Sequence, residues 1–116
     1  MVIFDIRERI FEFIQKLFEL IKVLPDNRIN RILINQIVRS GTSIGANYEE
    51  ADGTPTKKDF AYKMSLVKKE AKETKYWLKL IRLNNDNTYN VKIAELEDSN
   101  ETLIKIISKI IINSVI

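Results

Sequence analysis

The sequence predicts an all-α protein, an antiparallel up-down-up-down four-helix bundle formed as one domain by residues 1–116. Only three Gly and two Pro occur, and turn-forming residues cluster at three places along the chain. The four segments between these clusters are each roughly 20–28 residues long, which is too long for strands. Short connections between long helices place sequential helices antiparallel. We expect helices at approximately residues 3–24, 27–51, 57–83 and 89–112.

The first segment has an unusually wide apolar face. Its main stripe consists of Ile6, Ile10, Phe13, Leu17, Leu20 and Leu24. Phe4, Phe11 and Phe18 repeat every seven residues beside this stripe and widen the apolar arc to about 200°. Either the helix lies deep in its own bundle, or it forms a second seam against another subunit. We favour the second interpretation.

The second segment begins after Asp26, which we expect to be the N-cap. The first residues of its stripe, Ile29 and Leu33, are apolar, and the later residues are small or polar. The later stripe positions are Gln36, Ser40, Ser43 and Asn47, with Gly41, Gly45 and Ala46 beside them. Small residues let two helices approach closely, and polar groups on a core-facing stripe require hydrogen-bond partners.

The third segment combines a regular core line with a basic stripe. Thr56 and Asp59 have the spacing of a capping box. The core line follows a heptad pattern: Phe60, Met64, Val67, Ala71, Thr74, Leu78 and Ile81. Five basic residues each directly follow a residue of the core line and form a second stripe beside it: Lys68, Lys72, Lys75, Lys79 and Arg82. Residues 57–83 contain nine Lys or Arg against three acids, although the whole chain carries only +3.

The fourth segment should begin near residues 87–90 and continue as a helix despite its β-branched end. Leu96, Leu103, Ile107 and Ile110 form its stripe, and Ile104 and Ile111 add a second line. Ser99 is a candidate kink. The end of the segment, residues 110–112, is apolar all round, which is a second indication of oligomerisation.

The composition argues against an enzyme. The chain has neither Cys nor His, so it lacks thiolate metal ligands, disulfides and the commonest general base. Glu49, Glu50, Glu70 and Glu73 are the only candidate carboxylate cluster, but di-metal bundles use Glu-x-x-His pairs. We expect no enzymatic activity, no cofactor and no metal site. Since no signal peptide or membrane-spanning run is visible, we expect a cytoplasmic protein.

One long motif resembles a known family. The matching runs are QIVRSGTSIGANYEEA at residues 36–51, KDF at 58–60, KEAKET at 69–74, YWL at 76–78 and LP at 24–25. They resemble the bacterial four helix bundle protein family, the rRNA intervening-sequence protein family, and distantly the accessory proteins of diversity-generating retroelements. Glu49 and Ala51 depart from the common motif, in which a small apolar residue and Gly often stand.

The resemblance implies a four-helix bundle that assembles into a homopentamer and has no known enzymatic activity. In the distant retroelement branch, basic pentamers bind a reverse transcriptase and its RNA or DNA. The resemblance therefore suggests RNA, DNA or a protein such as a reverse transcriptase as partners.

A polar row within the motif is the first candidate site. Arg39, Ser43, Asn47 and Glu50 follow each other at spacings of four, four and three, along one edge of the second helix. The row either binds a ligand or partner, or forms a buried network that fixes helix register and subunit docking. We favour the network, in which Arg39 pairs with Glu70 or Glu73 of the next helix.

The basic stripe is the second candidate site. Lysines on the flank of a bundle are usually solvated, and five basic side chains alone do not establish a partner. Repetition in an oligomer would add many weak phosphate contacts. The sequence therefore leaves two functions open: an oligomeric nucleic-acid accessory protein, or a structural oligomer that binds a protein partner and no nucleic acid.

Overall fold

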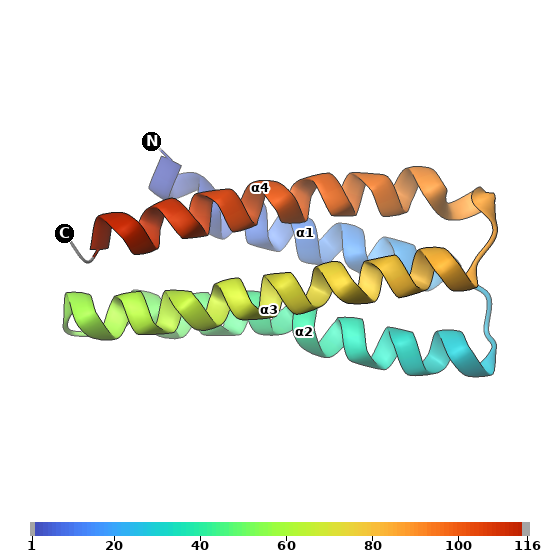
Figure 1. Ribbon diagram of the computed structural model, residues 1–116, viewed down its shortest axis with the longest axis horizontal. Helices are drawn as coiled ribbons and strands as arrows, with labels where there is room; N and C mark the ends of the chain where they lie inside the picture. Colours follow the sequence, from blue (N-terminus) through green and yellow to red (C-terminus); the bar gives the residue numbers. More distant parts are fainter. Residues whose placement is uncertain (1, 115–116) are drawn as a thin grey trace.

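The computed structural model describes residues 2–114, with side chains from residue 6 onward, and shows a four-helix bundle of 45 × 24 × 18 Å (Figure 1). The elements are α1 (Val2–Val23), α2 (Arg28–Asp52), α3 (Lys57–Asn84), the 3-10 turn η1 (Asn87–Tyr89) and α4 (Asn90–Ser114). Each helix contacts its neighbours in the order α1–α2–α3–α4–α1. The predicted fold class is therefore confirmed, and the helix ends lie within two residues of their expected positions.

The core is built from the predicted stripes of α1, α3 and α4, but the predicted stripe of α2 is wrong apart from Leu33 and Ser40. Ile29 is 53% exposed, and the residues that α2 buries are Asn30, Leu33, Ile37, Ser40, Gly41, Ile44, Tyr48 and Ala51. All six stripe residues of α1 are buried, and so is the heptad line of α3 apart from Phe60, which is half-buried. Leu96, Leu103 and Ile107 of α4 are also buried, whereas Ile110 is only half-buried. Phe11 and Phe18 point away from the core, and the side chain of Phe4 lies outside the described residues. Within residues 2–114, no helix has the length and apolarity needed to cross a membrane.

Small residues let α1 and α2 pack closely. A Cβ atom placed on Gly41 would lie 2.6 Å from Cδ2 of the buried Leu17, inside the van der Waals contact distance. At Gly45 the same atom would lie 3.3 Å from Ile14 Cδ1. The motif positions predicted to permit a close approach therefore do so, and the helix they approach is α1.

Two buried polar contacts cross between helices. The Ser40 and Thr74 hydroxyls lie 2.8 Å apart and join α2 to α3. Asn100 of α4 donates through Nδ2 to the carbonyl oxygen of Ala71 in α3 at 2.8 Å. A polar group inside a core is satisfied only in one helix register, so these contacts align α3 with both of its neighbours.

The helix caps follow the sequence with one exception, and the candidate kink at Ser99 is absent. Thr56 caps α3 as predicted, since its hydroxyl accepts a hydrogen bond from the Asp59 amide at 3.1 Å. Asp26 is not the N-cap of α2, because Asn27 occupies that position and its side chain accepts from the Asn30 amide at 2.9 Å. Asp26 instead forms an ion pair with Arg31, which lowers the pKa of the Asp26 carboxyl. Helix α4 runs through Ser99 without a break.

A buried asparagine joins the two loops at one end of the bundle. Asn30 Nδ2 donates to the Pro25 carbonyl and to Asn85 Oδ1, both at 2.9 Å. Its Oδ1 accepts from Asn84 Nδ2 at 2.9 Å and from Asn85 Nδ2 at 3.0 Å. These four hydrogen bonds tie the α1–α2 connection to the end of α3, an arrangement that the sequence did not indicate.

Candidate nucleic-acid interface

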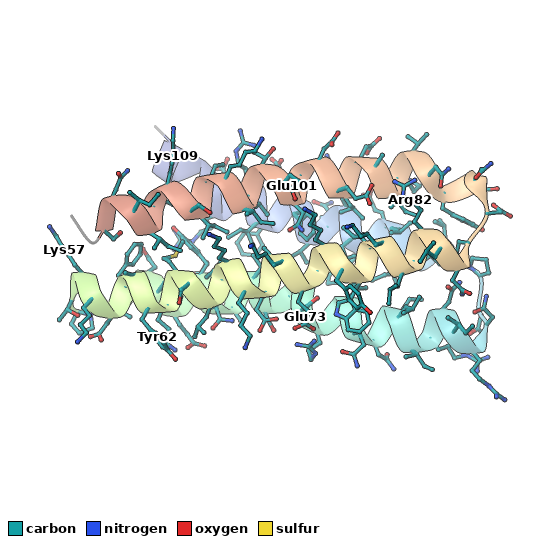
Figure 2. The ribbon with its side chains drawn as sticks, viewed as in Figure 1. Lys57, Tyr62, Glu73, Arg82, Glu101 and Lys109 are labelled. Atoms are coloured by element: carbon teal, nitrogen blue, oxygen red, sulfur yellow. The ribbon has the colours of Figure 1, made fainter. Side chains whose placement is uncertain are left out.

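The five predicted basic residues lie on the outer surface of α3, on the side that faces α4 (Figure 2). Lys72, Lys75 and Lys79 are exposed, and Lys68 and Arg82 are half-buried. Their position beside the heptad line brings the aliphatic stems against the core while the charged ends reach solvent. The stripe therefore exists as a continuous surface feature about 21 Å long, at 1.5 Å per residue.

Two members of the stripe are paired with acids of α4. Lys75 Nζ lies 2.7 Å from Glu101 Oε1, and Arg82 Nη2 lies 2.6 Å from Glu97 Oε1. Figure 2 shows Glu101 and Arg82 along the seam between the two helices. The two acids of α3 nearest to the stripe in sequence, Glu70 and Glu73, face α2 instead. Glu97 and Glu101 could have been found from their positions directly after the core residues Leu96 and Asn100.

The net charge around Glu101 remains positive although Glu101 is paired with Lys75. The Lys75 ammonium lowers the pKa of the Glu101 carboxyl, with further contributions from Lys105 and Lys72. Three cations thus surround one anion. Among the described residues, Lys68, Lys72 and Lys79 form no ion pair. The surface available to an external anion therefore consists of these three lysines, together with Lys105 from α4.

The polar row of the motif lies at the surface, so the expected buried network is wrong. Arg39 forms ion pairs with Glu70, at 3.6 Å, and with Glu73, but half of its side chain is exposed. Ser43 Oγ donates to the Arg39 carbonyl at 2.7 Å, and Asn47 Nδ2 donates to the Ser43 carbonyl at 2.9 Å. Hydroxyl and amide groups satisfied by their own helix have no need of burial or of a partner.

The remaining member of the row, Glu50, forms an ion pair with Lys63 of α3 at 2.7 Å. This contact raises the pKa of the Lys63 ammonium. The two end residues of the row, Arg39 and Glu50, therefore each form an ion pair with α3. Ser43 and Asn47 hydrogen-bond within α2 instead. The row helps to hold α2 against α3, and its predicted pairing of Arg39 with Glu70 and Glu73 is confirmed.

We expect Arg39→Ala to destabilise the bundle by about 1 kcal/mol, since a half-exposed ion pair contributes little more than this. The change leaves two neighbouring carboxylates, Glu70 and Glu73, without their shared cation. Thermal unfolding followed by circular dichroism should show a midpoint about 3–6 °C lower. Arg28→Ala is the control, because Arg28 is exposed and forms no ion pair among the described residues. Equal midpoints for the two variants would contradict this role of Arg39.

Glu73 also accepts a hydrogen bond from Trp77, which the sequence analysis had not assigned a partner. Trp77 Nε1 lies 2.9 Å from Glu73 Oε2, and the Trp77 ring meets Tyr76 edge-on with centroids 5.1 Å apart. Trp77 is half-buried and Tyr76 is exposed. The aromatic pair therefore lies on the outer side of α3, next to Arg39 and away from the seam with α4.

A second ionic cluster, which was not predicted, joins α1 to the end of α2. Arg7 binds Glu49 and Asp52, each at 2.9 Å, and lies 5.2 Å from the ring centroid of Tyr48. The two carboxylates raise the pKa of the Arg7 guanidinium. Glu49, which departs from the common form of the motif, thus has a specific partner in this chain.

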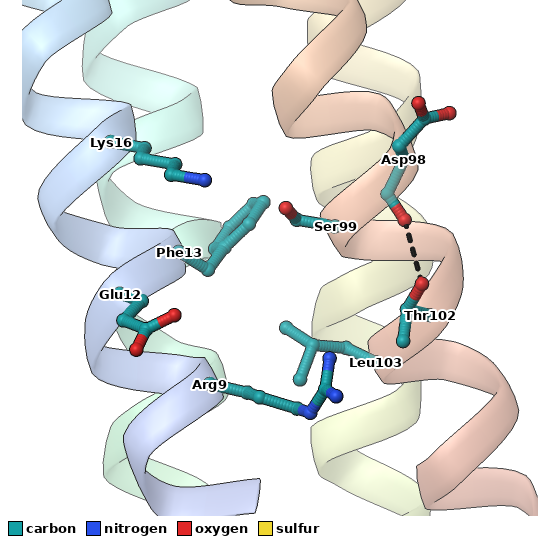
Figure 3. Close-up of a pocket in the computed structure, with 8 residues that line it drawn as sticks. All are labelled: Arg9, Glu12, Phe13, Lys16, Asp98, Ser99, Thr102 and Leu103. Carbon is teal, nitrogen blue, oxygen red and sulfur yellow. Dashed lines mark hydrogen bonds between the residues drawn. The ribbon is translucent and has the colours of Figure 1, made fainter. Parts of the chain in front are cut away.

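A small hollow between α1 and α4 is a weaker candidate site (Figure 3). It has a volume of about 170 Å³, with Arg9, Glu12 and Lys16 of α1 on one side and Asp98 of α4 on the other. The Thr102 hydroxyl already donates a hydrogen bond to the Asp98 carbonyl oxygen, at 3.1 Å. Because charges of both signs line the hollow, it offers no preference for an anion or a cation.

Comparison with known proteins identifies the family. The 23S rRNA-intervening sequence protein family matches residues 4–109. A crystal structure at 1.70 Å of a protein of unknown function from the S23 ribosomal protein family of Bacteroides thetaiotaomicron is 32% identical to this chain. The match covers 91% of this chain and 97% of that chain, with a TM-score of 0.81. No curated protein of assigned function matches significantly. The chain belongs to the 23S rRNA-intervening sequence protein family.

Proposed function

We propose that this protein is a non-enzymatic, oligomeric four-helix bundle that acts as an accessory protein of RNA or DNA. The contact surface in this proposal is the basic stripe of α3. The observation that carries the proposal is a row of three lysines, Lys68, Lys72 and Lys79, on one side of α3, which form no ion pair with any residue that the structure describes. A line of cations at fixed spacing suits a phosphate backbone.

The same surface lacks the features that read bases. It follows a convex helix in the side of a closed bundle. Its charged groups are lysines, which act as point charges, apart from Arg82, which is paired with Glu97. Phosphate contacts position a nucleic acid without reading its sequence. We therefore expect binding with weak sequence preference and strong dependence on salt.

The testing experiment is a titration of the purified protein into fluorescein-labelled structured RNA and duplex DNA, read by anisotropy at several salt concentrations. The logarithm of the binding constant should fall linearly with the logarithm of salt, with a slope of roughly −2 to −4 per protomer in contact. Absence of binding at the lowest salt would reject the proposal and make the stripe a solvated surface.

A further prediction concerns the two acids that occupy part of the stripe. The double variant Glu97→Gln, Glu101→Gln should bind RNA about tenfold more tightly at low salt, because it releases Lys75 and Arg82 for phosphate contacts. The control is Glu8→Gln, Glu19→Gln, which makes the same change of charge at exposed positions of α1. An equal gain in both variants would mean that only the net charge matters.

The alternative function is a structural oligomer with a protein partner and no nucleic acid. One observation favours it: the rings of Phe11 and Phe18 on α1 are 62% and 42% exposed, although they lie on a long, regular helix. Large apolar side chains grouped on one exposed face are typical of protein interfaces. In this proposal the face joins copies of the chain, a homopentamer by family resemblance, and a protein such as a reverse transcriptase binds the assembly.

We expect Phe11→Ser, Phe18→Ser to shift the sedimenting species from an oligomer to a monomer at micromolar concentration. The helix itself should persist, because both rings lie outside the core. The matched control is Leu83→Ser, Val91→Ser, which removes two large exposed apolar side chains from other elements and should leave the mass unchanged. A wild-type protein that sediments as a monomer would contradict the assembly.

A further inference from the structure

An open apolar groove lies at the end of the bundle where α3 begins and α4 ends. It has a volume of about 930 Å³, and Phe60, Ile106 and Ile110 supply apolar surface within it. All three of these side chains are only half-buried, and Ile112 next to them is 58% exposed. A monomer usually covers such side chains, so this apolar surface requires an explanation.

The charged residues described in the lining of the groove are all basic. Lys57, Lys105 and Lys109 line it, and no acidic residue is among its described lining residues. Figure 2 shows Lys57 and Lys109 at this end of the bundle. A second copy docked groove to groove about a two-fold axis would place these lysines against each other, which costs free energy. An occupant that complements the described lining residues combines apolar groups with negative charge.

The size and openness of the groove indicate the form of the occupant. The contributing part of α4, residues 104–114, is about 15 Å long at 1.5 Å per residue. Apolar anchors at positions i, i+4 and i+7 of a helix span about 10 Å and fit within this length. The groove is open to solvent along one side, whereas small-molecule sites enclose most of their ligand.

We propose that this groove binds an acidic amphipathic helix of a protein partner. The apolar face of the partner helix packs against Phe60, Ile106 and Ile110, and its flanking carboxylates pair with Lys57, Lys105 and Lys109. This site shares Lys105 with the surface proposed for nucleic acid but contains none of the unpaired lysines of the α3 stripe, so it does not depend on nucleic-acid binding.

The test uses two fluorescein-labelled 14-residue helical peptides. Both carry Leu at positions i, i+4 and i+7, and their flanking residues are Glu in one peptide and Lys in the other. The Glu peptide should bind the full-length protein at least tenfold more tightly than the Lys peptide. In Lys105→Glu, Lys109→Glu this preference should reverse, because the groove then carries the opposite charge. Amide chemical shifts of Ile106 and Ile110 should change on binding.

The control variant is Lys22→Glu, Lys92→Glu, which makes the same charge change at two exposed lysines outside the groove and should keep the wild-type preference. Ile110→Ser should weaken binding of either peptide without altering the order of preference. Binding of neither peptide overturns the proposal, and so does equal binding of both with no response to the charge reversal. Dodecanoate binding without peptide binding would assign the groove to a small amphiphile and also overturn it.

Discussion

Replacing Lys68, Lys72 and Lys79 by Gln is expected to weaken RNA binding about 100- to 1,000-fold at 50 mM salt. Each phosphate contact releases close to one counterion, which is worth about tenfold in affinity at this salt concentration. The three lysines form no ion pair among the described residues, so their charge is available to a ligand. The slope of the logarithm of affinity against the logarithm of salt should become about 2–3 units shallower.

The control for this variant is Lys16→Gln, Lys22→Gln, Lys92→Gln. It removes three charges from exposed positions on α1 and α4, so both variants lower the net charge of the chain from +3 to 0. Circular dichroism should give the same helix content for both proteins. If the two variants lose affinity equally, binding follows net charge, and α3 contains no specific surface.

Asn30→Ala should lower the free energy of unfolding by about 2–4 kcal/mol, the largest loss that we expect from a single polar side chain in this protein. Asn30 is fully buried and makes four hydrogen bonds, to Pro25, Asn84 and Asn85. Truncation removes all four and leaves the carbonyl and amide partners unpaired, at about 1–3 kcal/mol for each one that water does not reach. Urea unfolding followed by circular dichroism measures this loss.

Asn35→Ala provides the control, because Asn35 lies on the same helix with an exposed side chain. We expect this control to change stability by less than about 0.5 kcal/mol. A loss of similar size in both variants would show that Asn30 acts through helix propensity instead of through the loop contacts.

The fold could be predicted because the helices repeat their apolar residues regularly. The heptad line of α3 and the six-residue stripe of α1 each specify one buried face, and the turn clusters fix where each helix ends. The N-cap of α2 could not be fixed to one residue, since Asp26 and Asn27 are adjacent and both suit a cap. The choice depends on the loop geometry that places Asp26 next to Arg31.

The candidate sites were predicted less completely, because the charge available at a surface depends on the neighbouring helix. The sequence places Lys75 and Arg82 on the stripe, but only the rotation and register of α4 bring Glu101 and Glu97 against them. The prediction that the polar row is buried was wrong for a local reason. Ser43 and Asn47 bond to their own helix, which a pattern of spacings does not reveal.

Polar side chains link the helices around the bundle unevenly. Arg7 links α1 to α2, Arg39 and Lys63 link α2 to α3, and Lys75 and Arg82 link α3 to α4. Among the described side chains, no ion pair or hydrogen bond joins α4 back to α1, where the hollow of Figure 3 lies. Over the described part of this seam, apolar packing sets the register. Exchange of the first helix between copies would therefore break no polar contact with α4 among the described side chains, and the ion pairs of Arg7 with Glu49 and Asp52 are the polar contacts that such an exchange would have to replace.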